Sequence, residues 1–187
     1  MDMNRDESLE RLREALRGYQ PMKWNGMPDL ELYMDQVITY LKRQLSLFQD
    51  TSDLSLVTPS IINNYVKDGI VPRPVNKRYA REQLSALTMA CILKRVLPMQ
   101  RVGQLIMPGD VSAEAHYETF CKNLTAVLEA EAAHLGELEH ESLEELAMQY
   151  ALRASADCLI ADRLLAMLGD RKDEAAPGTA DRRGRKR

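Results

Sequence analysis

The stretch that decides the fold is residues 58–79, which read TPSIINNYVKDGIVPRPVNKRY. Thr58 is a residue type that caps helix N-termini, and Pro59 suits the first position of a helix. These signals predict a helix over 58–67, which a glycine ends. The two prolines that follow exclude further helix, because proline lacks an N–H and restricts the residue before it. An extended turn or a short hairpin is therefore expected over 72–79.

One face of this predicted helix carries only hydrogen-bonding side chains. Helical spacing places Ser60, Asn63, Asn64 and Lys67 together, with the aliphatic residues and Tyr65 towards the other side. None of the four is acidic, whereas a solvated surface helix usually mixes charge signs. Asparagine can pair with adenine in the major groove, and lysine neutralises phosphate. The face predicts contact with duplex DNA, and an ordinary solvated face is the alternative.

Most of the remaining chain also has apolar residues at helical spacing, between turn-forming residues. Long Val/Ile/Thr runs of period two are absent from the sequence, so we expect an all-α fold. The predicted helices are 5–17, 29–48, 80–96, 99–107, 112–135 and 141–168. Four units follow: an N-terminal helix with an irregular arm over 1–28, a domain over 29–108, a C-terminal helical unit over 109–168 and a disordered basic tail over 169–187.

The order of residues in the central domain resembles the MerR-type winged helix-turn-helix. That pattern has a Ser/Thr cap, an aliphatic residue, a tyrosine, then glycine, two aliphatic residues and proline. It matches Thr58, Ile62, Tyr65 and the run 69–72. The family then has a wing that ends at a tyrosine, followed by a helix that opens with acidic residues and leucine, as in 76–84 here. The stretch from Leu32 to Tyr79 is also similar to a bacterial family of unknown function built on this core.

The resemblance implies a sequence-specific DNA-binding transcriptional regulator with a recognition helix over 58–67 and a short basic wing over 72–79. MerR-type proteins usually carry Arg-Tyr-Tyr where this chain has Asn63-Asn64-Tyr65, so other basic residues would contact the phosphates. They also usually dimerise through a long helix after the DNA-binding domain, and helix 141–168 is long enough for a homodimer of that kind. The expected DNA-binding residues are Thr58, Ser60, Asn63, Asn64, Lys67, Arg73, Lys77, Arg78 and Tyr79.

Charge is strongly segregated along the chain, although the net charge is only −3. Residues 58–101 hold eight basic and two acidic residues, a net of +6. Residues 109–150 hold one basic and ten acidic residues, a net of −9, and residues 181–187 have a net of +4. The basic segment favours nucleic acid as a partner. The acidic segment has three possible interpretations. It could be an ordinary solvated helix pair, a surface that binds a basic partner, or a surface that repels DNA and so orients the molecule.

Catalytic, metal and membrane signatures are missing from the sequence. It has no phosphate loop, nucleophile elbow or CxxC motif, so we expect neither an enzyme nor a bound cofactor. His134, Glu137, His140 and Glu141 have partly helical spacing but lack the tight pattern of a zinc site. The three cysteines are expected to be reduced core residues. With no membrane-length apolar run and no signal peptide, the expected location is the cytoplasm.

Two other hypotheses remain open. In the first, the winged domain has lost DNA affinity and the protein is a protein–protein interaction module whose acidic helices bind the partner. The DNA hypothesis requires Lys67, Lys77 and Arg78 to share a surface with the asparagines, whereas the interaction hypothesis gains if those cations pair with the acidic helices. In the second, the C-terminal helices sense an unidentified small-molecule effector, which would need an apolar pocket with a few polar groups.

Overall fold

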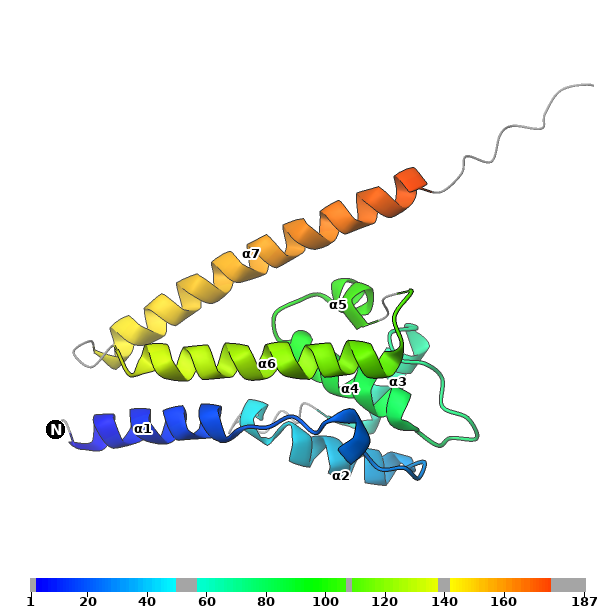
Figure 1. The fold of residues 1–187 in the computed structure, drawn as a ribbon, viewed down its shortest axis with the longest axis horizontal. Helices are drawn as coiled ribbons and strands as arrows, with labels where there is room; N and C mark the ends of the chain where they lie inside the picture. The colour runs from blue at the N-terminus through cyan, green and yellow to red at the C-terminus, as the bar shows by residue number, and fades with distance from the viewer. Residues whose placement is uncertain (1–2, 50–56, 107–108, 138–141, 176–187) are drawn as a thin grey trace, which may run out of the picture.

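The computed structural model describes residues 3–49, 57–106, 109–137 and 142–175 (Figure 1). Within these ranges the protein is all-α, with no β-strand and two isolated β-bridges. The α-helices and short 3-10 helices (η) are α1 Met3–Gly18, η1 Trp24–Gly26, α2 Met34–Gln44, η2 Ser46–Phe48, α3 Pro59–Lys67, α4 Arg81–Leu93, α5 Met99–Ile106, α6 Ala113–Leu135 and α7 Leu143–Ala175.

Helix α4 is the centre of the fold. Every residue from Gln83 to Cys91 is buried, so the helix is covered on all sides. It packs against α2, α5 and α6. Its buried hydroxyls bond back to the helix itself, as Thr88 Oγ1 does to the Leu84 carbonyl at 2.8 Å, so α4 brings few unsatisfied polar groups into the core.

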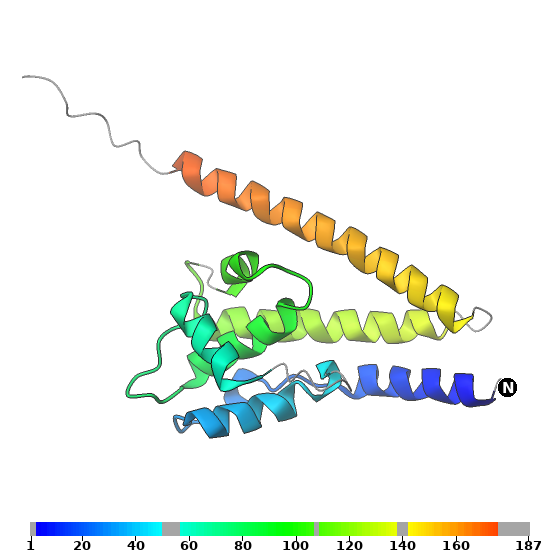
Figure 2. The same ribbon diagram turned by 180° about the vertical axis from the view of Figure 1, so that it is seen from behind.

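The long helices α1 and α6 lie side by side and antiparallel (Figures 1 and 2). Arg13 of α1 ties them together, because its Nε donates to the Ala132 carbonyl at 3.3 Å near the C-terminus of α6. A cation suits this end of a helix, where carbonyl groups lack intrahelical partners and the macrodipole is negative. Arg13 therefore helps to fix the position of α1.

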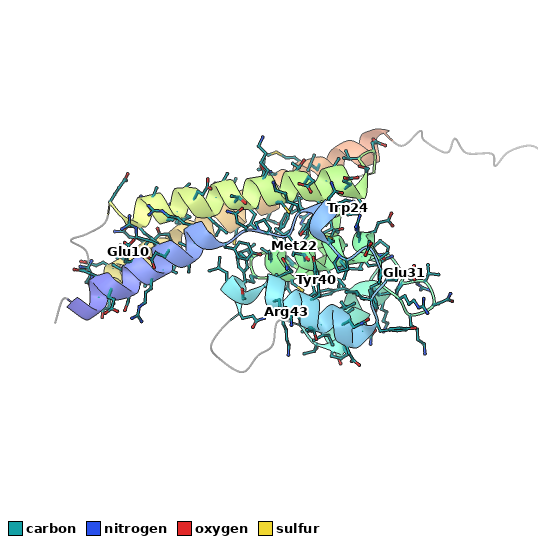
Figure 3. The ribbon with its side chains drawn as sticks, turned by 60° about the horizontal axis from the view of Figure 1, so that its bottom comes forward. Glu10, Met22, Trp24, Glu31, Tyr40 and Arg43 are labelled. Carbon is teal, nitrogen blue, oxygen red and sulfur yellow. The ribbon has the colours of Figure 1, made fainter. Side chains whose placement is uncertain are left out.

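The arm over residues 19–28 fastens α2 to α6. The Tyr117 hydroxyl donates to the Met22 carbonyl at 2.9 Å, and the Trp24 N–H donates to Glu118 Oε1 at 2.7 Å. Met27 is buried, and Met22 and Trp24 pack against the same core. Figure 3 shows both of these residues on the segment that passes between α6 and α2.

A single hydrophobic core joins the segments 29–108 and 109–168. Tyr117 and Cys121 of α6, together with Leu165 of α7, belong to the same buried cluster as α2, α3 and α4. Cys91 and Cys121 are buried free thiols, as expected, and burial raises the pKa of Cys91 to about 12. Cys158 is also free but only half-buried.

The structure corrects two predicted helix boundaries. The helix expected over 29–48 begins only at Met34, because Leu32 instead forms a β-bridge with Tyr79. At the other end of the chain, α7 continues to Ala175, so the first residues of the expected disordered tail are helical. The basic cluster of that tail, 181–187, lies outside the described residues.

Helix α7 diverges from α6 along its length (Figures 1 and 2). Leu146 and Leu165 are its only buried residues between 143 and 168. Two salt bridges connect it to the body, Arg101–Asp162 and Arg153–Glu131, each with an N–O distance of 2.9 Å. A set of large apolar side chains on α7 is exposed: Leu143, Met148, Leu152, Leu159, Ile160, Leu164, Met167 and Leu168.

No helix in the described ranges has the length and apolar character needed to cross a membrane.

The Tyr117→Phe variant should lower the free energy of unfolding by about 1 kcal/mol, because the half-buried Met22 carbonyl loses its hydroxyl donor. Urea denaturation measures this loss. Tyr40→Phe is the matched control, since the buried Tyr40 hydroxyl has no hydrogen-bond partner among the described residues, and its removal should be neutral or stabilising. Equal losses in the two variants would contradict this account of the arm.

Candidate nucleic-acid interface

Helix α3 presents its polar face to solvent. Thr58 caps it, since its Oγ1 accepts the Ile61 N–H at 3.2 Å. Ile62 and Tyr65 are buried in the core and so fix the rotation of the helix. The side that faces away from the core exposes the four residues expected there: Ser60, Asn63, Asn64 and Lys67.

The chain leaves α3 through a tight turn. Gly69 has a φ of +72°, a left-handed conformation that glycine adopts without steric cost. The Tyr65 carbonyl then accepts the N–H groups of both Ile70 and Val71, at 2.9 and 3.1 Å, and the two side chains are buried. These contacts hold the start of the 72–79 loop directly against the end of α3.

The tip of the 72–79 loop is a two-residue turn. Val75 and Arg78 form a β-bridge, with a 2.8 Å hydrogen bond from the Arg78 N–H to the Val75 carbonyl. Asn76 and Lys77 between them both have positive φ, 49° and 62°, as in a type I′ turn. Asparagine tolerates this conformation, but lysine pays about 1 kcal/mol for it. Lys77 lies exposed at the tip of the loop.

The structure places two of the expected DNA-binding residues away from the exposed surface. Tyr79 is only 3% exposed and exchanges two 2.9 Å backbone hydrogen bonds with Leu32. Thr58 is half-buried, and its hydroxyl oxygen already accepts a hydrogen bond as the N-cap of α3. Both therefore position the elements, whereas the side chains of the other seven expected residues are exposed.

The two elements that carry the exposed residues lie at one end of the molecule. Helix α3 and the 72–79 loop lie together at the end opposite the start of α1 (Figures 1 and 2). Within the described ranges, Lys67, Arg73, Lys77 and Arg78 form no salt bridge. Arg78 instead donates its Nε–H to the Tyr33 hydroxyl at 3.2 Å. The cations thus remain uncompensated by the carboxylates of the acidic helices.

Sequence reasoning missed one further cation beside α3. The ammonium of Lys94, at the end of α4, lies 5.7 Å from the centre of the Tyr65 ring, a cation–π arrangement. This contact places a positive charge beside α3, on the side of Tyr65. The only sign of this cation in the sequence was the adjacent basic pair Lys94–Arg95. Helical periodicity alone does not show that Lys94 lies near Tyr65.

Elsewhere, the described residues form several pockets and no metal-binding cluster. No group of three potential metal-binding side chains occurs in the part of the chain that the structure describes. A pocket of about 320 Å³ lies between Pro72, α4, the end of α5 and the start of α6. Met89, Ile106 and Val111 give it apolar walls, and His116 is among its polar groups. This is where the effector hypothesis would place a small molecule.

The geometry defines an all-α protein with a polar helix and a basic turn exposed at one end. Residues 22–124, more than half of the chain, match the family model described as Domain of unknown function (DUF1836), and the chain belongs to this family. The match covers most of the arm, α2 to α5 and the first half of α6, while α1 and α7 lie outside it. Neither a curated protein nor a solved structure was found to match the chain.

The Lys77→Gly variant should raise the free energy of unfolding by about 0.5–1 kcal/mol, because Asn-Gly is the preferred type I′ pair and the lysine is strained. Thermal or urea denaturation measures the gain. Lys67→Gly is the control: it removes the same charge from the last residue of α3, where φ is not positive, and should bring no gain in stability. A destabilised Lys77→Gly protein would show that the turn does not have this geometry.

Proposed function

We propose that this protein is a sequence-specific DNA-binding transcriptional regulator, in which α3 is the recognition helix of a MerR-like winged helix-turn-helix and residues 72–79 are its wing. The observation that carries the proposal is the surface at the end of the molecule. A helix face of serine, asparagine and lysine lies beside a turn whose cations have no carboxylate partners.

The chemistry of this surface suits a DNA duplex. Asn63 and Asn64 offer both a donor and an acceptor, the pattern that the adenine edge requires in the major groove. Lys67 and the wing residues Arg73, Lys77 and Arg78 would contact phosphates and set the register of the helix. The strained backbone at Lys77 supports the same role, because such strain is concentrated at functional positions.

The alternative is a protein–protein interaction module that has lost DNA affinity. It would gain support if the basic residues paired with the acidic helices. Among the described residues, Arg101 at the end of the basic 58–101 segment pairs with Asp162 of α7, and Arg153 pairs with Glu131 of α6, whereas Lys67, Lys77 and Arg78 form no salt bridge. This distribution favours DNA over a protein partner.

The double variant Lys77→Ala/Arg78→Ala should bind duplex DNA from upstream of its own gene about 10- to 100-fold more weakly than the wild type, because two phosphate contacts are lost. Fluorescence anisotropy at several salt concentrations measures it. The slope of log affinity against log salt should fall by about two, since each lost contact contributes about 0.9.

The control is Arg11→Ala/Arg17→Ala, which removes two exposed cations from α1 and should leave affinity and slope close to wild type. Absence of wild-type binding at low salt, even to generic duplex, would refute the DNA proposal and favour the interaction module.

We also propose that the protein is a homodimer joined through the exposed apolar side of α7. Met148, Leu152 and Leu159 are each more than half exposed and lie along one side of the helix. An antiparallel pair would bring Glu144 near the start of one α7 towards Arg163 in the second half of the other, and would oppose the two helix dipoles. A two-fold dimer would present two recognition helices to a palindromic site.

Light scattering after size exclusion should give a dimer for the wild type and a monomer for Leu152→Glu/Leu159→Glu, because buried glutamates in an apolar seam are costly. Val96→Glu, at an exposed apolar position in the turn that follows α4, should remain dimeric. A monomeric wild type, or a dimeric double variant, would contradict this interface.

A further inference from the structure

A pair of side chains joins the loop to the start of α2, through a residue that the sequence did not single out. The Arg78 guanidinium carbon lies 5.2 Å from the centre of the Tyr33 ring, within the range of a cation–π interaction. The same arginine donates its Nε–H to the Tyr33 hydroxyl at 3.2 Å. Tyr33 therefore contacts Arg78 through both its ring and its hydroxyl.

Tyr33 is itself held firmly by the backbone around it. It is the N-cap residue of α2, and its N–H donates to Gln36 Oε1 at 2.9 Å. The preceding residue, Leu32, forms the two backbone hydrogen bonds with Tyr79, the neighbour of Arg78. The backbones that carry Tyr33 and Arg78 are thus fixed next to each other by neighbouring contacts.

The side chain that contacts Arg78 is neutral, so it does not cancel the positive charge of the arginine. A carboxylate in the same place would hold the arginine but would also cancel the charge that attracts phosphate. A tyrosine ring orients the guanidinium and leaves its full positive charge. Arginine has five N–H donors, and the contact with Tyr33 uses only the one on Nε. The four on the terminal nitrogens are left for a bidentate phosphate contact.

From this geometry we infer that Tyr33 is a positioning residue for DNA binding, which holds Arg78 in the orientation that contacts a phosphate. The inference rests on the proposed function and deepens it by adding a residue from α2 to the wing. Tyr33 is 53% exposed, so its side chain contributes little to the core. Its substitution can therefore be tested without unfolding the protein.

The test is a double-mutant cycle on the full chain, measured by anisotropy with the same duplex. Tyr33→Ala should weaken binding about fivefold to tenfold, and Tyr33→Phe, which keeps the ring, by about threefold or less. In the Arg78→Ala background, Tyr33→Ala should have no further effect, because it acts through Arg78. Leu30→Ala, an exposed position on the same segment, should bind as the wild type does.

The salt dependence separates positioning from charge. Arg78→Ala should lower the slope of log affinity against log salt by about one, whereas Tyr33→Phe should leave it unchanged, since Arg78 stays charged. The inference is overturned if Tyr33→Ala binds as the wild type does, or loses the same factor with and without Arg78; the DNA-binding proposal then still stands. A wild type that binds no duplex would overturn both.

Discussion

Two backbone hydrogen bonds between Leu32 and Tyr79 hold together the end of the molecule that carries α3 and the 72–79 loop. They join segments that are far apart in the chain, each at 2.9 Å, and the Tyr79 side chain is buried beside them. The bridge fixes the end of the 72–79 loop against the start of α2. Ala80, the next residue, is the N-cap of α4, and its N–H donates to Gln83 Oε1. The bridge therefore also fixes where α4 begins, so the exposed turn, α2 and α4 are all positioned by the same pair of hydrogen bonds.

The chemistry at this end depends on what is absent from around the cations as much as on the cations themselves. Lys67 and Lys77 have no salt-bridge partner among the described residues. Arg78 also has none there, and it contacts the Tyr33 ring instead. Carboxylates are present nearby, since Asp29 and Glu31 lie on the segment that pairs with Tyr79 and Asp68 follows Lys67. Within the described ranges none of them forms a salt bridge with these cations, so the cations stay available to a polyanion.

The sequence predicted the elements whose signals are local. Thr58 and Pro59 mark the start of α3, and Ser112 marks the start of α6, because a cap and its helix lie within a few residues of each other. The four polar residues of α3 were expected on one face for the same reason, and the structure exposes all of them.

Long-range contacts account for what could not be predicted. Apolar periodicity extended the second helix back to Asp29, but pairing with Tyr79 holds Leu32 in an extended conformation. The same pairing buries Tyr79, which motif similarity had placed with the DNA-binding residues. The contact of Tyr33 with Arg78 depends on this bridge, so no local pattern reveals it. The type I′ turn was hidden because lysine, rather than glycine, follows Asn76.

The central claim is that α3 and the 72–79 loop form the surface that binds duplex DNA. Hydrogen exchange measured by mass spectrometry, with and without excess duplex, tests it most directly because it locates the contact on the folded chain. The account predicts added protection in peptides covering residues 58–81 and the start of α2, with α1 unchanged. Protection confined to the acidic helices, or no change anywhere under saturating duplex, would contradict it.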